Sequence, residues 1–162
     1  MSKLSYCLWF DGKAEEAANF YVSVFKTGKL GKITRYGKEG FEQHQQPEGK
    51  VMVAEFEIEG HKYMALNGGP YFKFNESFSI VVSCQTQEEV DYYWDKLISG
   101  GGSPSQCGWL KDKFGVSWQI TPAILEKYMS DPDSKKTERV VKAYMPMTKL
   151  IIEDLKKAYE GK

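Results

Sequence analysis

The feature that most constrains the fold is an internal repeat, because the chain resembles itself when it is shifted by 73 residues. Residues 5–10 then fall on residues 78–83, and residues 14–21 fall on residues 87–94, without a gap. In each half an apolar, strand-like stretch precedes a helical stretch that opens with two glutamates, which suit the positive end of a helix dipole. The repeat therefore predicts two related units that each begin with a strand and a helix.

Further strands are predicted after each of the two helices. Residues 32–37, 51–59 and 61–67 are rich in β-branched, aromatic or alternating residues, and Gly60-His61 is a candidate for a tight hairpin turn. After the second helix a run of three glycines acts as a terminator, and strands are predicted in residues 106–111 and 117–121. Each unit is thus a βαβββ module or a shortened form of one. The modules are expected over residues 4–70 and 77–122.

The pattern becomes helical after the second module. Ile124, Leu125 and Tyr128 form one short apolar face, Asp131-Pro132-Asp133 breaks it, and later apolar positions mark helices interrupted at Pro146. We therefore expect a helical tail over residues 123–162. A chain of 162 residues has the size of one domain, so residues 1–162 are expected to form a single domain. The tail packs either on its own sheet or on a partner subunit, and the sequence favours neither.

Composition excludes several classes of partner. The 22 basic residues balance the 22 acidic ones, so no overall field gathers nucleic acid or an anionic membrane surface. No apolar run approaches the roughly 20 residues of a membrane-spanning helix, and the N-terminus lacks the apolar core of a secretory signal. The odd number of cysteines, Cys7, Cys84 and Cys107, is typical of reduced thiols. We expect a cytoplasmic protein that binds neither nucleic acid nor membranes.

Duplicated βαβββ modules are the architecture of the glyoxalase/bleomycin resistance/extradiol dioxygenase superfamily, also called the vicinal oxygen chelate superfamily. Within it, residues 7–21 and 107–122 resemble the PhnB-like, or 3-demethylubiquinone-9 3-methyltransferase, family. The resemblance covers residues 4–150 and implies an α+β fold of paired modules, a ligand groove and a homodimer. The methyl transfer of the label is not supported, because no glycine-rich turn joins a strand to a following helix.

Metal-using relatives carry a histidine on the first strand and a glutamate on the last strand of a module. The glutamate often lies four residues after a glycine, and here Gly115 plus four gives Gln119, a weak neutral ligand. The matching position in the first module falls near Ala65. His44 and His61 lie in a loop and at a hairpin, and the first strands offer only Ser5, Tyr6, Phe78 or Ser79. We therefore predict no family metal centre and no cofactor.

Strand alternation predicts which side chains line the groove. Ser117, Gln119 and Thr121 form a polar face, opposite Trp118 and Ile120. By the same parity Cys107 shares a face with Trp109 and Lys111, and Cys7 shares one with Trp9. A nucleophilic role for the cysteines is disfavoured, because neither has an obvious histidine base. The predicted groove residues are Cys7, Trp9, Asn67, Cys107, Trp109, Lys111, Ser117 and Gln119.

An aromatic-walled groove with a few polar groups suits a small, flat or partly apolar ligand. We therefore expect a glyoxalase-like protein that binds a small molecule without the family metal centre. Two alternatives stay open. One is an enzyme, for example a metal-assisted lyase or isomerase, and the other is a module that binds another protein through the C-terminal helices.

Overall fold

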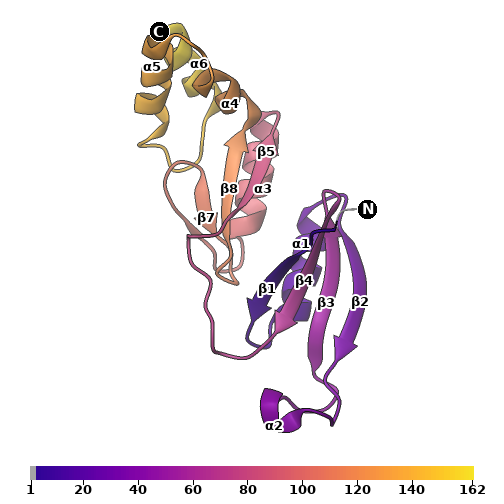
Figure 1. Ribbon diagram of the computed structural model, residues 1–162. Helices are drawn as coiled ribbons and strands as arrows, with labels where there is room; N and C mark the ends of the chain where they lie inside the picture. The colour runs from indigo at the N-terminus through magenta and orange to yellow at the C-terminus, as the bar shows by residue number, and fades with distance from the viewer. Residues whose placement is uncertain (1–2) are drawn as a thin grey trace. The chain divides into compact units, whose positions relative to one another are not determined.

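The computed structural model describes residues 3–162, and the chain divides into two compact units, Met1–Phe74 and Asn75–Lys162 (Figure 1). Each unit contains one four-stranded sheet. Within residues 3–162 no helix combines the length and the apolar character that crossing a bilayer requires.

The first unit is a complete βαβββ module in which the strand order is β1-β4-β3-β2. β1 runs parallel to β4, and the other neighbouring strands are antiparallel. The β3–β4 hairpin turns at Glu59-Gly60, where both residues have positive φ angles, so the turn lies one residue before the predicted position. The elements are β1 (Tyr6–Phe10), α1 (Ala14–Val24), β2 (Lys29–Arg35), α2 (Phe41–His44), β3 (Val51–Ile58) and β4 (His61–Asn67).

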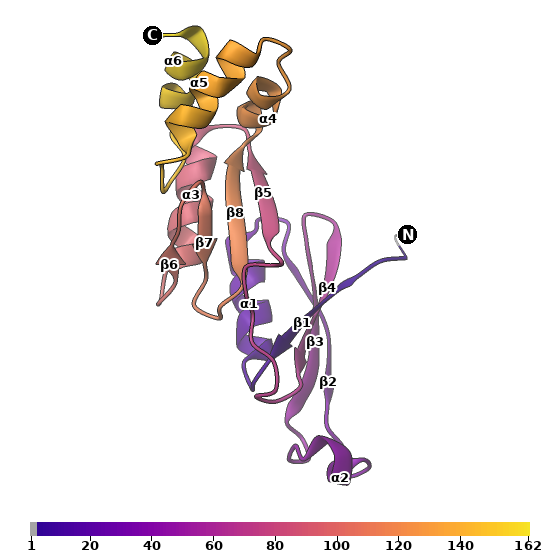
Figure 2. The same ribbon diagram turned by 60° about the vertical axis from the view of Figure 1, so that its left-hand side comes forward.

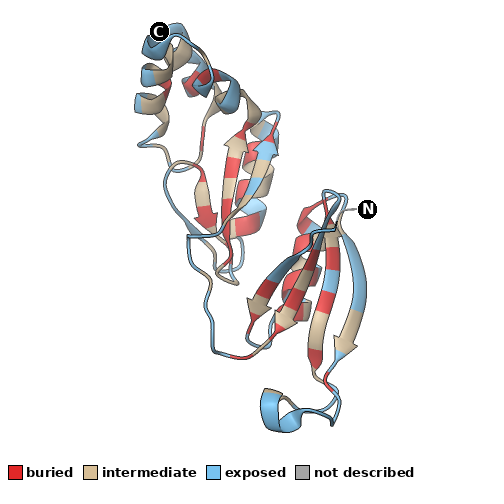
Figure 3. Ribbon diagram, in the orientation of Figure 1, coloured by how far each residue is buried: buried red, intermediate tan, exposed pale blue. Residues whose placement is uncertain are grey.

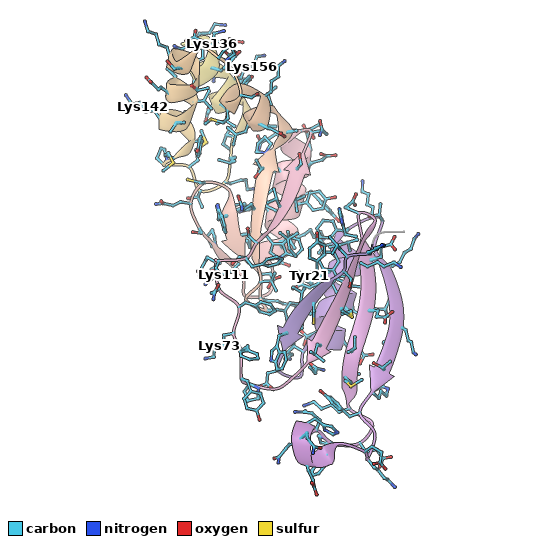
Figure 4. The ribbon with its side chains drawn as sticks, in the orientation of Figure 1. Tyr21, Lys73, Lys111, Lys136, Lys142 and Lys156 are labelled. Carbon is cyan, nitrogen blue, oxygen red and sulfur yellow. The ribbon has the colours of Figure 1, made fainter. Side chains whose placement is uncertain are left out.

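Helix α1 covers one face of this sheet and forms the core of the module (Figures 1 and 3). Its contact stripe begins with Ala14, Ala17 and Ala18, all fully buried, and small side chains let the helix lie close to the strands. Tyr21, labelled in Figure 4, continues the stripe, with its ring centroid 5.6 Å from that of Phe56 on β3. We call the opposite side of each sheet its helix-free face.

The second unit repeats this plan in the order β5-β8-β7-β6, and its last three strands are shorter than their counterparts in the first unit (Figure 2). β5 runs parallel to β8, and α3 buries Val90, Trp94 and Leu97. Trp118 and Ile120 on β8 are fully buried in the same core, as the alternation of β8 predicts. The elements are β5 (Ile80–Cys84), α3 (Gln87–Ile98), β6 (Ser103–Pro104), β7 (Trp109–Lys111) and β8 (Ser117–Pro122).

The repeat is not free of gaps, and this corrects the predicted register of the strands. The helices superimpose at the offset of 73, since Tyr21 and Trp94 are both buried against their sheets. The strands do not, because Leu8 is 2% exposed whereas Val81, 73 positions later, is 57% exposed. The cause is the connection between strand and helix, which is residues 11–13 in the first module and residues 85–86 in the second. The strands therefore correspond at an offset of 74.

The C-terminal helices α4 (Ala123–Met129), α5 (Ser134–Tyr144) and α6 (Ile152–Glu160) confirm the helical tail and its predicted breaks. They share a small core around Tyr128, Val140 and Leu155, whereas Lys142 and Lys156 are exposed on their surface (Figure 4).

A segment between α5 and α6 ties the tail to the second sheet. Met147 and Thr148 accept hydrogen bonds from the backbone N–H groups of Cys107 and Gly108, at 2.7 and 2.9 Å. Leu150 is 1% exposed and lies against Gly108. The tail is therefore part of the second unit. The strand predicted for residues 106–111 begins only at Trp109, because Cys107 and Gly108 both have positive φ angles and form a turn.

Candidate functional site

The helix-free face of the second sheet brings together four of the predicted groove residues. Trp109 pairs with Gln119 across the β7–β8 ladder, and Lys111 pairs with Ser117. Residues directly opposite each other on antiparallel strands project to the same side, so these four side chains share one face. Trp118 and Ile120 project to the other side, toward α3.

A hollow of about 170 Å³ lies on this face. Lys111 and Glu76 form an ion pair at the hollow. The hydrogen bond from the Lys111 ammonium group lowers the pKa of Glu76, so this carboxylate stays ionised at neutral pH. Figure 4 labels Lys111 at the β7 side of the unit. The main lining residues are Glu76, Ser103, Ser105, Trp109, Lys111 and Ser117.

Ser117 contributes a buried hydroxyl group to this site. The residue is 2% exposed, and its Oγ is the one buried side-chain N or O atom in residues 3–162 without a hydrogen-bond partner. An unpaired buried polar group costs ~1–3 kcal/mol, so a ligand or water that hydrogen-bonds there removes a penalty. Next to it, the side-chain amide of Gln119 donates to Ser79 Oγ at 2.8 Å, and this bond fixes its orientation.

Cys7 and Trp9 lie on the helix-free face of the first sheet. The Trp9 indole N–H donates to the Gly69 carbonyl at 2.8 Å, and its ring centroid is 4.9 Å from that of Phe72. Gly68 contacts the same ring so closely that a Cβ atom there would lie 2.1 Å from it. Trp9 is thus held by the segment that follows β4. Cys7 pairs with Met64, and burial raises the pKa of its thiol, which disfavours the reactive thiolate.

Asn67 and Cys107, the two remaining predicted groove residues, lie elsewhere. Asn67 is on the helix side of β4 and is 2% exposed. Its Oδ1 accepts from Ala14 N–H at 2.9 Å, and its Nδ2 donates to the Val51 carbonyl at 3.0 Å. Cys107 is in the turn before β7, and its thiol donates to the Met145 carbonyl at 3.4 Å. Both side chains are used in internal contacts.

The strand register also corrects the predicted metal positions. Because Tyr6 pairs with Tyr63 and Ile80 pairs with Trp118, the counterpart of Gln119 in the first module is Met64. Ala65, near which this position was predicted, is fully buried on the helix side, one residue away from Met64.

The side chains do not fit the metal centre of the superfamily. The first strands place Cys7 and Val81 beside Met64 and Gln119 on the helix-free faces. This set has neither a histidine nor a carboxylate, the donors that hold catalytic divalent cations. Within residues 3–162 no three His, Cys, Asp or Glu side chains form a group that could hold a metal ion. His44 is engaged in its own loop, where Nδ1 accepts from Gln46 N–H at 3.0 Å.

Sequence reasoning did not identify Glu76, Ser103 or Ser105 as site residues. Ser103 belongs to a strand of two residues, which is too short to show alternation. Glu76 lies in the connection before β5, where no periodic pattern exists. Its ion pair with Lys111 is a tertiary contact, and the sequence carries no local signal for it.

Two four-stranded sheets, each with a parallel strand pair and one helix across one face, define a glyoxalase-like fold. The chain belongs to the 3-demethylubiquinone-9 3-methyltransferase family, whose sequence model matches residues 2–121. The PhnB protein from Bacillus cereus is 36% identical with a TM-score of 0.66, and the match covers 75% of this chain and 100% of that protein. No curated protein matches the chain.

Two more distant structures share the fold. Protein PA1353 from Pseudomonas aeruginosa is 22% identical with a TM-score of 0.59, over 75% of this chain and 98% of that one. The fosfomycin resistance protein FosX from Listeria monocytogenes, solved with Mn(II) and sulfate, is 16% identical with a TM-score of 0.54, over 80% of this chain and 96% of that one. The family match ends at residue 121, so the helical tail lies outside it.

Proposed function

We propose that the protein binds a small organic molecule on the helix-free face of its second module, without the metal centre of the superfamily. The buried Ser117 hydroxyl carries this proposal, because it borders a hollow and lacks a partner within residues 3–162. A ligand group that hydrogen-bonds to this hydroxyl would remove the cost of leaving it unpaired.

The chemistry of the lining favours a flat, uncharged ligand. Trp109 offers an aromatic wall and Ser117 a hydroxyl group in the lining, and Gln119 lies opposite Trp109 on the same face, outside the lining. The charge of Lys111 is balanced by Glu76, so the site does not require an ionised ligand. A volume of about 170 Å³ is below the ~300 Å³ at which sites for drug-sized molecules begin. The ligand is therefore a small ring with a polar edge, or that part of a larger molecule.

The methyl transfer in the family label is not part of the proposal. A nucleotide-type methyl donor is usually held by a glycine-rich turn between a strand and a helix. The connections from β1 to α1 and from β5 to α3, Asp11-Gly12-Lys13 and Gln85-Thr86, contain a single glycine in total. Residues 36–40 contain two glycines, but they join the antiparallel strand β2 to α2, a helix of four residues.

The test uses benzamide, a flat ring with an uncharged polar edge, and benzoate, its anionic counterpart. Amide and indole signals of the ¹⁵N-labelled protein are followed by NMR during each titration. We expect benzamide to shift the signals of Trp109, Ser117 and Gln119, and Ser117→Ala to weaken its binding about fivefold or more. Ser83→Ala, an exposed serine on β5, is the matched control. Equal affinities of the two variants, or shifts away from this face, contradict the proposal.

The enzyme alternative makes an opposite forecast about metals. Calorimetric titration of the protein with Zn, Ni, Mn and Fe salts separates the two. A stoichiometric site with a dissociation constant of about 1 µM or below contradicts metal-free binding.

A homodimer and a cytoplasmic location remain proposals from the family resemblance and the sequence. Sedimentation equilibrium of the full chain tests the first, with a mass of one chain as the contradicting result.

A further inference from the structure

A second hollow, of about 390 Å³, lies on the helix-free face of the first module. This volume is within the ~300–1,000 Å³ range of small-molecule sites. The hollow receives residues from all three antiparallel strands of the sheet. The residues that matter for its chemistry are Lys29, Gly31, Glu55, Glu57, Lys62 and Met64.

The hollow exists because Gly31 has no side chain. The register of β2 against β3 shifts between Leu30 and Ile33, and this irregularity places Gly31 against Glu55. A Cβ atom on Gly31 would lie 3.1 Å from Glu55 Cβ and 3.2 Å from the Glu55 carbonyl oxygen. On the other side of Glu55, β4 contributes the flexible apolar side chain of Met64.

The charges along this face are arranged unevenly. Glu57 is the cross-strand neighbour of Lys29 on one side and Lys62 on the other, so two lysines flank one carboxylate. Glu55 is exposed, and the lining residues beside it, Gly31 and Met64, carry no charge. The register shift also places Lys32 opposite Glu55, but Lys32 does not line the hollow. One end of the hollow thus holds a carboxylate with no charged lining residue directly opposite it, and the other holds two ammonium groups around one carboxylate. The first end attracts a cation, and the second has a net positive charge that attracts an anion.

We propose that this hollow binds a small zwitterion with an ammonium group at Glu55 and a carboxylate at the row of Lys29 and Lys62. Glu55 and Glu57 are two residues apart on one strand, which sets a separation of roughly 7 Å between the charged rows. An α-amino acid is too short to span this distance. An ω-amino carboxylate with four or so methylene groups spans it, and the methylene chain lies along Met64.

The inference rests on residues different from those of the proposed function, so either stands if the other fails. The test is an NMR titration of the ¹⁵N-labelled full chain with 5-aminopentanoate. Pentylamine and pentanoate each lack one of the two charges, and alanine carries both at a shorter distance. We expect 5-aminopentanoate to shift the amide signals of Gly31, Glu55 and Met64, with a dissociation constant of about 1 mM, and the other three probes to bind more weakly.

Two variants separate charge from shape. Glu55→Gln keeps the size of the side chain and is expected to weaken 5-aminopentanoate binding about fivefold, the effect of one exposed ion pair. Glu42→Gln, an exposed glutamate on α2, is the matched control and should bind as the unmodified chain does. Gly31→Val fills the hollow and is expected to abolish the shifts, with the signals of α1 showing that the module remains folded. Equal binding of pentanoate and 5-aminopentanoate, unchanged binding by Glu55→Gln, or no clustered shifts overturns the inference.

Discussion

The two modules contain the same strand–helix unit but stabilise the start of the helix differently. Helix α3 is capped locally, because Thr86 Oγ1 accepts from Glu89 N–H at 3.3 Å and the Glu89 carboxylate accepts from Gln85 N–H at 2.6 Å. Helix α1 begins after Lys13, whose side chain makes no cap. Its first N–H group, that of Ala14, donates instead to Asn67, which is 53 residues away on β4.

An orphan N–H group at a helix start can thus be satisfied by a near residue, as in α3, or by a distant one, as in α1, with different consequences for folding. The local cap of α3 forms with the helix itself. The distant cap of α1 requires β4 to be in place. The same Asn67 side chain also links β4 to β3, since it donates to the Val51 carbonyl. We therefore expect the first module to lose more stability than the second when its cap is removed.

The largest effect is expected from Asn67→Ala. The substitution leaves the Ala14 N–H and the Val51 carbonyl buried without their partner, at a cost of ~2–4 kcal/mol. The free energy of unfolding is measured in urea, with hydrogen exchange in α1 and β4 assigning the loss to the first module. Asn19→Ala, which removes an exposed bond to the Glu15 carbonyl, is the control. A loss below ~1 kcal/mol would show that water replaces the cap.

A smaller effect is expected from Thr86→Ala in the second module. Loss of an N-cap hydroxyl costs ~1 kcal/mol, and hydrogen exchange should place this loss in α3. Thr86→Ser keeps the hydroxyl group and should retain nearly the full stability. If Thr86→Ala proved as costly as Asn67→Ala, the contrast between local and distant caps would be wrong.

An effect of opposite sign is expected from Ser117→Ala. The equivalent position in the first module is the exposed Lys62, whereas the Ser117 hydroxyl is buried without a partner. Alanine removes the desolvation penalty, so the stability of the unliganded second module should rise by up to ~1 kcal/mol in thermal or urea unfolding. Ser83→Ala should change nothing. Destabilisation by Ser117→Ala would indicate that the hydroxyl is satisfied in the unliganded protein.

The smallest perturbation is the chemical modification of two cysteines, one on the first strand of each module. Burial, with a contribution from the Glu89 charge, raises the pKa of Cys84 to about 12, and its side chain is fully buried. Cys7 is exposed, although burial raises its pKa as well. At pH 8 iodoacetamide should therefore modify Cys7 well before Cys84, as followed by peptide mass spectrometry. Equal rates would mean that the β5 end of the second module opens as readily as solvent reaches Cys7.

The fold could be predicted because each half of the repeat contains two recognisable patterns, an apolar strand-like stretch and a helical stretch that opens with two glutamates. The offset of 73 aligned the two helices correctly, since Tyr21 and Trp94 occupy equivalent buried positions. The strand register was wrong by one residue, because Ile80, Val81 and Val82 are all apolar and show no alternation. The connection between strand and helix is one residue shorter in the second module, and a strand without alternation does not reveal this difference.

The candidate site was predicted in part for the same physical reasons. β7 and β8 form a hairpin with clear alternation, so Trp109, Lys111, Ser117 and Gln119 were placed on one face correctly. Asn67 continues the pattern of β4, but no sequence pattern reveals that its partner is the distant N–H group of Ala14. Contacts of this kind depend on tertiary structure.

The attachment of the tail has a consequence for how the chain can be shortened. Similarity to the family ends at residue 121, yet the Gln87 side chain bridges the Leu150 carbonyl and the Ile152 N–H, and Lys149 bonds Asp91 and Asp95 on α3. Cleavage near Pro122 would expose the side of the sheet that Leu150 covers. The end of the family match is therefore not the end of the folded unit, and a chain shortened to residue 121 is expected to be less stable than the full chain.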